Sequence, residues 1–199
     1  VAATMRLAQL AGIKVFATGG IGGVHRGAEE NFDISADLIE LSRTPVVVVS
    51  AGAKAILDLP ATLEYLETLS VPVIGYKTSD FPAFYSRSSG LPLSVRLDDP
   101  VEIAKVFYHQ LQLGIQSGML VANPLPEKYD IPFAEMDRYI NVALEDARDA
   151  GISGKQLTPF LLGRIVELTS GSSLETNRAL ALNNVRLGAK IAASLVELT

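Results

Sequence analysis

Short apolar runs alternate with helical segments from the start of the chain to residue 122, and this pattern constrains the fold more than any other feature. Residues 46–49 are four consecutive valines, typical of a strand buried on both faces. The alternation predicts an α/β fold: a mostly parallel or mixed central sheet with helices on both faces and a helical C-terminal region. We predict strands at 13–17, 46–49, 71–75, 93–97 and 119–122, and helices at 2–11, 35–43, 54–69, 98–117, 132–150, 158–169 and 173–198.

Composition narrows the class of protein. The 199 residues are 48% hydrophobic, enough for one domain with a sizeable core, and neither a repeat nor a linker interrupts the chain. The net charge of −5 argues against a nucleic-acid polymer as partner. No apolar run reaches membrane-spanning length, so we expect no membrane association. The chain has no cysteine, which excludes disulfides and thiolate metal sites.

Lys54 follows the valine run through a turn of small residues, Ser-Ala-Gly-Ala, and we expect a helix to open at this lysine. The amine would then lie at the carboxyl end of a strand, where α/β folds place their sites. Burial and the positive end of the helix dipole both disfavour an ammonium there. A neutral amine can attack a carbonyl or a sugar C1 and form an imine. The alternative, favoured by this stretch alone, is a surface lysine in a first helical turn.

Residues 18–27, Thr-Gly-Gly-Ile-Gly-Gly-Val-His-Arg-Gly, form the glycine loop, which offers bare backbone N–H groups to an anion. The loop lacks the third glycine of the dinucleotide fingerprint and is not a Walker loop. An equally good interpretation is a flexible strand-to-helix turn. His25, beside Arg26, suits a phosphate or a hydroxyl, although a loop histidine without a function is an open alternative.

Two polar clusters have both a structural and a functional interpretation. Asp33 and Asp37 bracket Ser35 at a predicted helix start, where acids and serine are the usual caps. The same groups could bind a hard divalent cation and a sugar hydroxyl. Asn177 follows a serine-rich turn and could either belong to a capping region or reach a polar base.

Taken together, these segments resemble the pseudouridine-5′-phosphate glycosidase family, also called pseudouridylate synthase, which includes indigoidine synthase A-like proteins. The blocks that carry the match span the chain in family order: 1–5 (Val-Ala-Ala-Thr-Met), 16–27, 33–38, 50–58 (Ser-Ala-Gly-Ala-Lys-Ala-Ile-Leu-Asp), 62–68, 123–124, 158–162 and 173–177 (Ser-Leu-Glu-Thr-Asn). The resemblance implies reversible cleavage of the C–C bond between uracil C5 and ribose C1′ of pseudouridine 5′-phosphate, giving uracil and ribose 5-phosphate in pseudouridine catabolism.

The resemblance also assigns roles to residues. It makes Lys54 the nucleophile that forms an imine with C1′, and Asp33 the ligand of a divalent metal, most often manganese, with magnesium or another ion left open. It implies a homotrimer and a cytoplasmic location, an organelle not being excluded. The positions it places at the substrate are Val1, His25, Ser35, Ala36, Asp37 and Asn177, and Thr18 and the rest of the glycine loop could hold the 5-phosphate.

The chain departs from the family at its front. The family's proton-donating glutamate and a substrate-binding lysine belong to an N-terminal portion, and this sequence begins after both. We therefore expect residues 1–199 to be the C-terminal part of the glycosidase catalytic domain, inactive by itself. Two alternatives remain: a phosphosugar aldolase or isomerase, for which the eight repeats of a barrel are missing, and a catalytically incomplete homologue that acts as a binding or assembly module.

Overall fold

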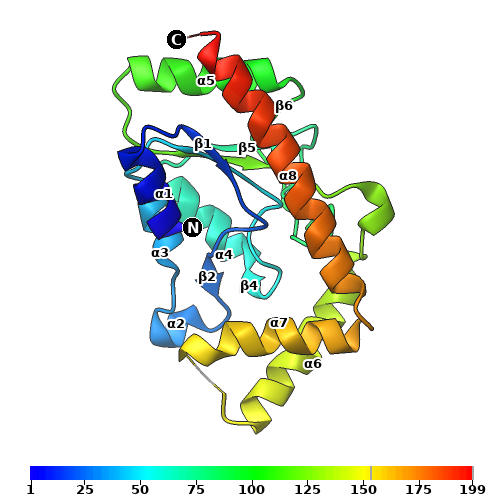
Figure 1. Ribbon diagram of the computed structural model, residues 1–199. Coiled ribbons are helices and arrows are strands. Elements are labelled where there is room, and N and C mark those ends of the chain that lie inside the picture. Colours follow the sequence, from blue (N-terminus) through cyan, green and yellow to red (C-terminus); the bar gives the residue numbers. More distant parts are fainter. Residues whose placement is uncertain (153, 199) are drawn as a thin grey trace.

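The fold is built on one five-stranded parallel sheet (Figure 1), in a computed structural model that describes residues 1–152 and 154–198. The strand order is β1-β3-β7-β5-β6, and every neighbouring pair is parallel. This confirms the predicted α/β class with its mostly parallel sheet. The strands are β1 (Val15–Ala17), β3 (Val47–Ser50), β7 (Met119–Ala122), β5 (Val73–Tyr76) and β6 (Val95–Leu97).

Strand β3 lies inside the sheet, with Val47 opposite Val15 of β1 and Met119 of β7. Its side chains alternate between the two faces, as the pleat of a strand requires. Val47 and Val49 pack with one group of buried residues, whereas Val46 and Val48 pack with the other. All four valines are fully buried, which is why this run has no polar alternation.

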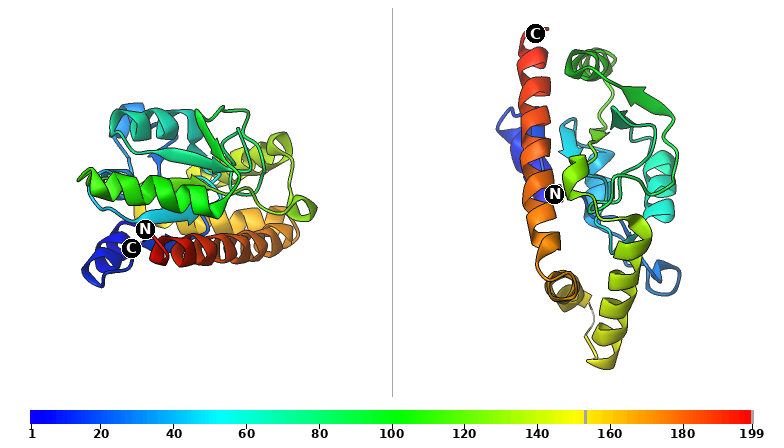
Figure 2. Two further views of the ribbon diagram at one scale, coloured as in Figure 1. Left: turned by 90° about the horizontal axis from the view of Figure 1, so that it is seen from above. Right: turned by 90° about the vertical axis from the view of Figure 1, so that its right-hand side faces the viewer.

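Helices cover both faces of the sheet, as predicted, and Figure 2 shows the sheet between them. Ile103, Phe107 and Ile191, from α5 and α8, share a core with Val47 and Val49. Met5, Leu38 and Leu66, from α1, α3 and α4, share the core on the other face. The covering helices are α1 (Ala2–Leu10), α3 (Ala36–Leu41), α4 (Leu59–Thr68), α5 (Pro100–Gln112) and α8 (Ser172–Val196).

The helical C-terminal region also agrees with the prediction. Helices α6 (Phe133–Asp149) and α7 (Leu157–Leu168) pack against each other at the opposite end of the molecule from α5 (Figure 1). Arg164 Nε of α7 lies 2.7 Å from Asp146 Oδ2 of α6. Short 3₁₀ turns, Glu127–Tyr129 and Gly154–Gln156, precede the two helices. None of the helices in the described part of the chain combines the length and the apolar character that a bilayer crossing requires.

The prediction that a helix opens at Lys54 is wrong, because α4 begins at Leu59. Asp58 caps α4 by accepting a hydrogen bond from Ala61 N at 2.9 Å, and Pro60 stands in the first turn. The residues before it form β4 (Leu57–Asp58), which pairs antiparallel with β2 (Val24–His25). This two-stranded antiparallel sheet and the short helix α2 (Ala28–Asn31) were not predicted.

Candidate active site

The glycine loop and the turn that carries Lys54 lie side by side, because they follow the neighbouring strands β1 and β3. Ile21 N donates to Gly52 O at 3.1 Å, and Lys54 N donates to Ile21 O at 3.1 Å. These bonds extend the parallel pairing past the ends of the strands. The structure therefore fixes the backbone of Lys54 to the loop that could bind an anion.

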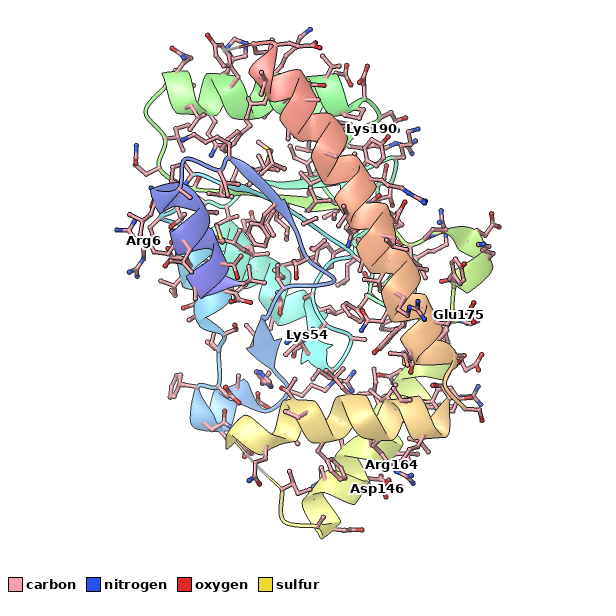
Figure 3. The ribbon with its side chains drawn as sticks, in the orientation of Figure 1. Arg6, Lys54, Asp146, Arg164, Glu175 and Lys190 are labelled. Atoms are coloured by element: carbon pink, nitrogen blue, oxygen red, sulfur yellow. The ribbon has the colours of Figure 1, made fainter. Side chains whose placement is uncertain are left out.

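The side chain of Lys54 is half-buried and lies beside β2 and β4 (Figure 3). Within the described part of the chain, its ammonium has neither a hydrogen-bond nor an ion-pair partner. Since α4 begins five residues later, its dipole does not act on this amine as we expected from the sequence. The amine is thus placed at the carboxyl end of a central strand, unpaired and partly shielded from water.

Gly20 and Gly22 of the loop are required by close contacts rather than by flexibility. A Cβ atom on Gly22 would lie 2.2 Å from Ser35 Oγ, and one on Gly20 would lie 2.5 Å from the Phe84 ring. A Cβ on Gly19 would lie 3.4 Å from Asn177 Oδ1. The loop is therefore packed between Ser35 on one side and Asn177 on the other. This arrangement brings together residues that are far apart in the sequence.

Asp37 holds the loop to the start of α1. Its Oδ2 accepts a hydrogen bond from Gly22 N at 2.8 Å, and its Oδ1 accepts one from Ala2 N at 2.7 Å. The main-chain nitrogen of Val1 lies 3.3 Å from the same Oδ1. Ser35 caps α3 by accepting from Asp37 N at 3.3 Å, and Ala36 is the exposed first residue of that helix. The capping interpretation of Ser35 is thus confirmed.

Asp33 and His25 lie together at the other end of the loop. His25 N donates to Asp33 O at 3.0 Å, and Asp33 Oδ2 is 3.9 Å from His25 Nδ1. The Asp33 side chain is 49% exposed. Among the described residues no three His, Asp or Glu side chains gather as a metal-binding group. One carboxylate open to solvent does fit a magnesium-like ion that keeps several waters, since such ions use only one or two protein carboxylates.

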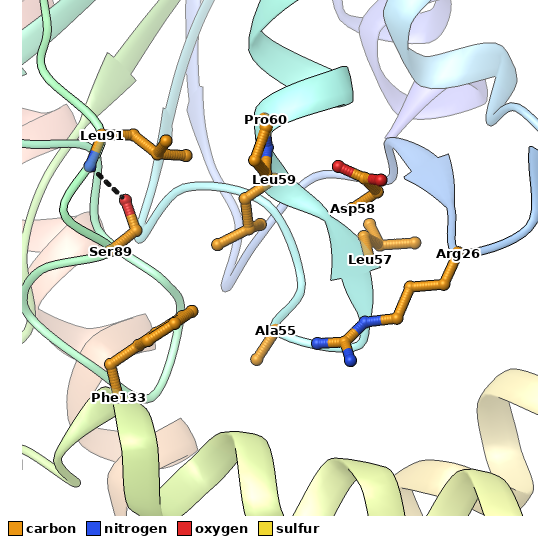
Figure 4. Close-up of a pocket in the computed structure, with 9 residues that line it drawn as sticks. All are labelled: Arg26, Ala55, Leu57, Asp58, Leu59, Pro60, Ser89, Leu91 and Phe133. Atoms are coloured by element: carbon orange, nitrogen blue, oxygen red, sulfur yellow. Dashed lines mark hydrogen bonds between the residues drawn. The ribbon is translucent and has the colours of Figure 1, made fainter.

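A cavity of about 310 Å³ adjoins the Lys54 turn through Ala55 (Figure 4). None of the predicted site residues in the described part of the chain lines it. Arg26, which we expected near a phosphate, instead lies 2.9 Å from Asp137 Oδ1 and donates to Asn141 Oδ1 at 3.0 Å. The remaining walls are mainly apolar, so we place the candidate active site at the glycine loop. The lining residues are Arg26, Ala55, Leu57, Asp58, Leu59, Pro60, Ser89, Leu91 and Phe133.

Sequence reasoning did not single out Phe84 and Tyr85. Phe84 N donates to Ala51 O at 2.9 Å, and its φ of 63° is rare for a residue other than glycine. The rings of Phe84 and Tyr85 pack edge to face, with 4.7 Å between the ring centroids. Burial raises the pKa of Tyr85 to about 12. The signal that could have found these residues is an aromatic pair within a segment otherwise rich in serine and proline.

The chain matches one family profile and several named proteins over nearly its whole length. The sequence profile of the family described as indigoidine synthase A like protein matches residues 1–194. A protein of Caldanaerobacter subterraneus subsp. tengcongensis named pseudouridine-5′-phosphate glycosidase is 60% identical over 198 residues, covering 100% of this chain and 64% of that protein. A protein of Solibacter usitatus with the same name is 60% identical over 195 residues, covering 98% of this chain and 65% of its own length.

Two solved structures share the fold. The prealnumycin C-glycosynthase AlnA, in complex with ribulose 5-phosphate, matches with a TM-score of 0.92 and 36% identity, covering 98% of this chain and 64% of that one. An indigoidine synthase A-like protein from Thermotoga maritima matches with a TM-score of 0.88 and 42% identity, covering 97% of this chain and 63% of that one. The present chain thus spans about 64% of the length of the first of these relatives.

Fold and site together define a parallel α/β protein with a glycine loop and an amine, unpaired among the described residues, at the carboxyl ends of neighbouring strands. More particularly, the chain belongs to the indigoidine synthase A like protein family. This confirms the resemblance seen in the sequence.

Proposed function

We propose that this chain supplies the imine-forming part of a pseudouridine-5′-phosphate glycosidase, which reversibly converts pseudouridine 5′-phosphate and water into uracil and ribose 5-phosphate. The observation that carries the proposal is the position of Lys54: an unpaired amine whose backbone is bonded to the glycine loop. The names of the relatives that are 60% identical over this chain support the substrate. The pentose phosphate bound in a relative of the same fold supports a sugar phosphate at the site.

The chemistry requires an amine because the bond to be cleaved joins two carbons. Uracil C5 departs without an oxygen or nitrogen atom whose protonation would help it leave. In the proposed reaction, Lys54 Nζ forms a bond to C1′ while the C1′–O4′ bond breaks and O4′ takes a proton. Uracil C5 is then protonated, the C1′–C5 bond breaks, and the nitrogen lone pair forms the C1′ imine. Water hydrolyses the imine to ribose 5-phosphate and restores the lysine.

Protonation of uracil C5 needs a positioned acid. The resemblance places that acid, a glutamate, in a portion of the family that this chain does not cover. We therefore propose that residues 1–199 carry the nucleophile and the sugar-phosphate groups of a larger catalytic domain. The proposal predicts that the 199-residue chain by itself releases no uracil from pseudouridine 5′-phosphate at a steady rate.

The other site residues are proposed to hold the substrate. Thr18 and the backbone N–H groups of Gly19, Gly20 and Gly23, which make no hydrogen bond among the described residues, would bind the 5-phosphate. Asp33 would hold a hydrated Mn²⁺ or Mg²⁺ ion, which supplies positive charge for the phosphate. His25 and Asn177 would contact the sugar and the base.

The residues at the start of α1 and α3 complete this proposed set. Ser35 and Ala36 lie at the start of α3, and the main-chain nitrogen of Val1 contacts Asp37 of the same helix. Both carboxylate oxygens of Asp37 already accept backbone hydrogen bonds. We therefore propose that Asp37 acts on the substrate indirectly, by fixing Val1 and Gly22.

Reductive trapping tests the proposal. The purified chain is incubated briefly with ribose 5-phosphate and borohydride, and the covalent adduct is measured by intact-mass spectrometry. We expect one adduct per chain in the original sequence and in Lys105→Met, which alters an exposed lysine of α5, and none in Lys54→Met. Absence of an adduct in a folded sample of the original sequence would overturn the enzymatic proposal.

The incomplete coverage of the relatives also favours a second candidate, a binding or assembly module that has the fold without the chemistry. Titration with ribose 5-phosphate separates the two candidates, since a module binds the ligand or a partner without forming a reducible adduct. The proposed assembly is a homotrimer. Exposed apolar side chains on α1 and α8 offer surface for contacts between subunits: Leu7, Leu10, Leu182 and Val185. Sedimentation velocity measures the oligomeric state.

A further inference from the structure

Two buried asparagines connect the glycine loop to α8. Asn123 follows strand β7 and is 3% exposed, and Asn184 lies in α8 and is fully buried. Asn123 Nδ2 donates to Asn184 Oδ1 at 2.9 Å. Asn184 Nδ2 donates to Thr18 O at 2.8 Å and is 3.4 Å from Gly19 O. The pair therefore ties the first carbonyls of the loop to the helix that covers it.

A polar pair in this place needs an explanation. On the same helix, Leu180 and Leu187 are buried on either side of Asn184, so the position belongs to the apolar core. Burying an amide is unfavourable unless its hydrogen bonds are made. Here Asn184 accepts a hydrogen bond from Asn123 and donates to the loop, and a buried network of this kind fixes a single arrangement of the groups it joins. The group fixed by Asn184 is the backbone of the glycine loop.

The same backbone continues to Lys54. Gly19 O, the weaker acceptor of Asn184, also accepts a hydrogen bond from Ala51 N at 2.9 Å. Two residues further along the loop, Ile21 O accepts from Lys54 N at 3.1 Å. The backbone of the loop between Thr18 and Ile21 therefore connects the α8 amide to the turn that carries the amine, with hydrogen bonds at both ends.

We infer that Asn184, oriented by Asn123, is a positioning residue for Lys54: it sets where the loop lies and hence where the amine meets C1′ of the sugar. The inference rests on the proposed function of Lys54. Positioning of this kind acts on the rate of bond formation more than on the binding of the sugar phosphate, because small displacements of a reacting group are costly in rate.

The Asn184→Asp variant tests this. It preserves the volume of the side chain and the acceptor for Asn123 Nδ2, but replaces the donor to Thr18 O by an oxygen. The matched control is Asn183→Asp, because the neighbouring Asn183 donates to Pro124 O at 3.0 Å and does not bond to the loop. The measurement is the rate of borohydride trapping of ribose 5-phosphate at a series of concentrations, with circular dichroism to confirm folding.

At a pH high enough to ionise the introduced carboxyl, we expect Asn184→Asp to lower the rate at saturation by about tenfold, with the half-saturating concentration within about twofold of that of the original chain. Asn183→Asp should alter neither quantity. Burial favours the protonated form of the introduced carboxyl, and that form can donate to Thr18 O. The rate of Asn184→Asp relative to Asn183→Asp should therefore rise as the pH is lowered, a signature that a general loss of packing would not produce.

An unchanged saturating rate in folded Asn184→Asp across the whole pH series overturns the inference, as does an equal loss in Asn183→Asp. If Asn184→Asp does not fold, Asn123→Ala provides the second test, since it leaves Asn184 in place and removes the donor that orients its amide. Asn123→Ala must then show the same selective loss of rate, and an unchanged rate overturns the inference. Failure of the proposed function is distinguishable, because the original chain would then form no adduct at all.

Discussion

Replacing Gly22 by alanine should destabilise the protein and separate the glycine loop from α3. The added Cβ would lie 2.2 Å from Ser35 Oγ, 2.6 Å from Ser35 Cβ and 3.0 Å from Asp37 Oδ2. Rotation of the Ser35 side chain removes the first overlap but not the second, because the position of a Cβ is set by the backbone. The loop or the start of α3 must therefore move, which also lengthens the 2.8 Å bond from Gly22 N to Asp37.

The size of the effect follows from these two contributions. Overpacking in a tight site destabilises by about 1–3 kcal/mol. Weakening a hydrogen bond to a charged acceptor adds about 1.5–3 kcal/mol. Together they lower the free energy of unfolding by about 3–5 kcal/mol, a large part of the roughly 5–15 kcal/mol available to a natural domain. For a chain of this length, the melting temperature should fall by roughly 10 °C.

Thermal unfolding followed by calorimetry and circular dichroism measures this change. Gly163→Ala is the matched control, because Gly163 lies within α7 and, apart from the backbone of its own helix, no atom of the described residues is within 4 Å of its added Cβ. Alanine should stabilise that helix by about 1 kcal/mol at most. If Gly22→Ala instead melts within about 2 °C of the original chain, the loop does not pack against Ser35 and Asp37 as described.

Three further predictions concern other parts of the account. Asp33→Ala should weaken Mn²⁺ binding by about tenfold or more, as measured by the paramagnetic resonance of the free ion. The control Asp149→Ala, at an exposed position of α6, should bind Mn²⁺ as the original chain does. Equal binding by the two variants would refute the proposed metal role of Asp33. Thr62→Val should lower the free energy of unfolding, measured by urea titration, by about 1–3 kcal/mol. The reason is that Val24 N loses its acceptor Thr62 Oγ1, which lies at 3.0 Å. An unchanged free energy of unfolding would contradict that hydrogen bond. The pKa of Tyr85 is raised to about 12, so the unfolded chain loses this proton first and stability falls as the pH rises from about 10 to 12, by up to about 3 kcal/mol. Tyr85→Phe should remove that part of the alkaline loss in urea titrations, and an identical pH dependence in both proteins would count against it.

The main elements of the fold could be predicted because their patterns are local. The valine run of β3 and the periodic apolar residues of α6, α7 and α8 carry their own signal. The antiparallel pairing of β2 with β4 could not be predicted, since strands of two residues show no periodicity and the two partners lie far apart in the sequence. The start of α4 was misplaced because Ala55 and Ile56 face the core from a turn and imitate the apolar side of a helix. The sequence Asp58-Leu59-Pro60 held the correct signal, a capping acid followed by proline.

The candidate site likewise contains some residues that the sequence could predict and others that it could not. Lys54 and the glycine loop could be found because strand ends and glycines stand out in a sequence. The role of Asp37 could not be read in this way, since its two acceptor bonds reach Ala2 and Gly22 across 35 and 15 positions. The bond from Asn184 to Thr18 spans 166 positions, and a helical asparagine shows nothing of this in the sequence. Contacts of this range depend on the assembled fold.

The most direct test of the central claim is to locate the reduced adduct on the chain. After borohydride trapping with ribose 5-phosphate, the protein is digested with trypsin and the peptides are sequenced by mass spectrometry. An adduct on Lys54 prevents cleavage there, so we predict a single modified peptide spanning residues 44–77. An adduct spread over exposed lysines such as Lys105 and Lys190, with cleavage after Lys54 intact, would contradict the assignment of Lys54 as the nucleophile.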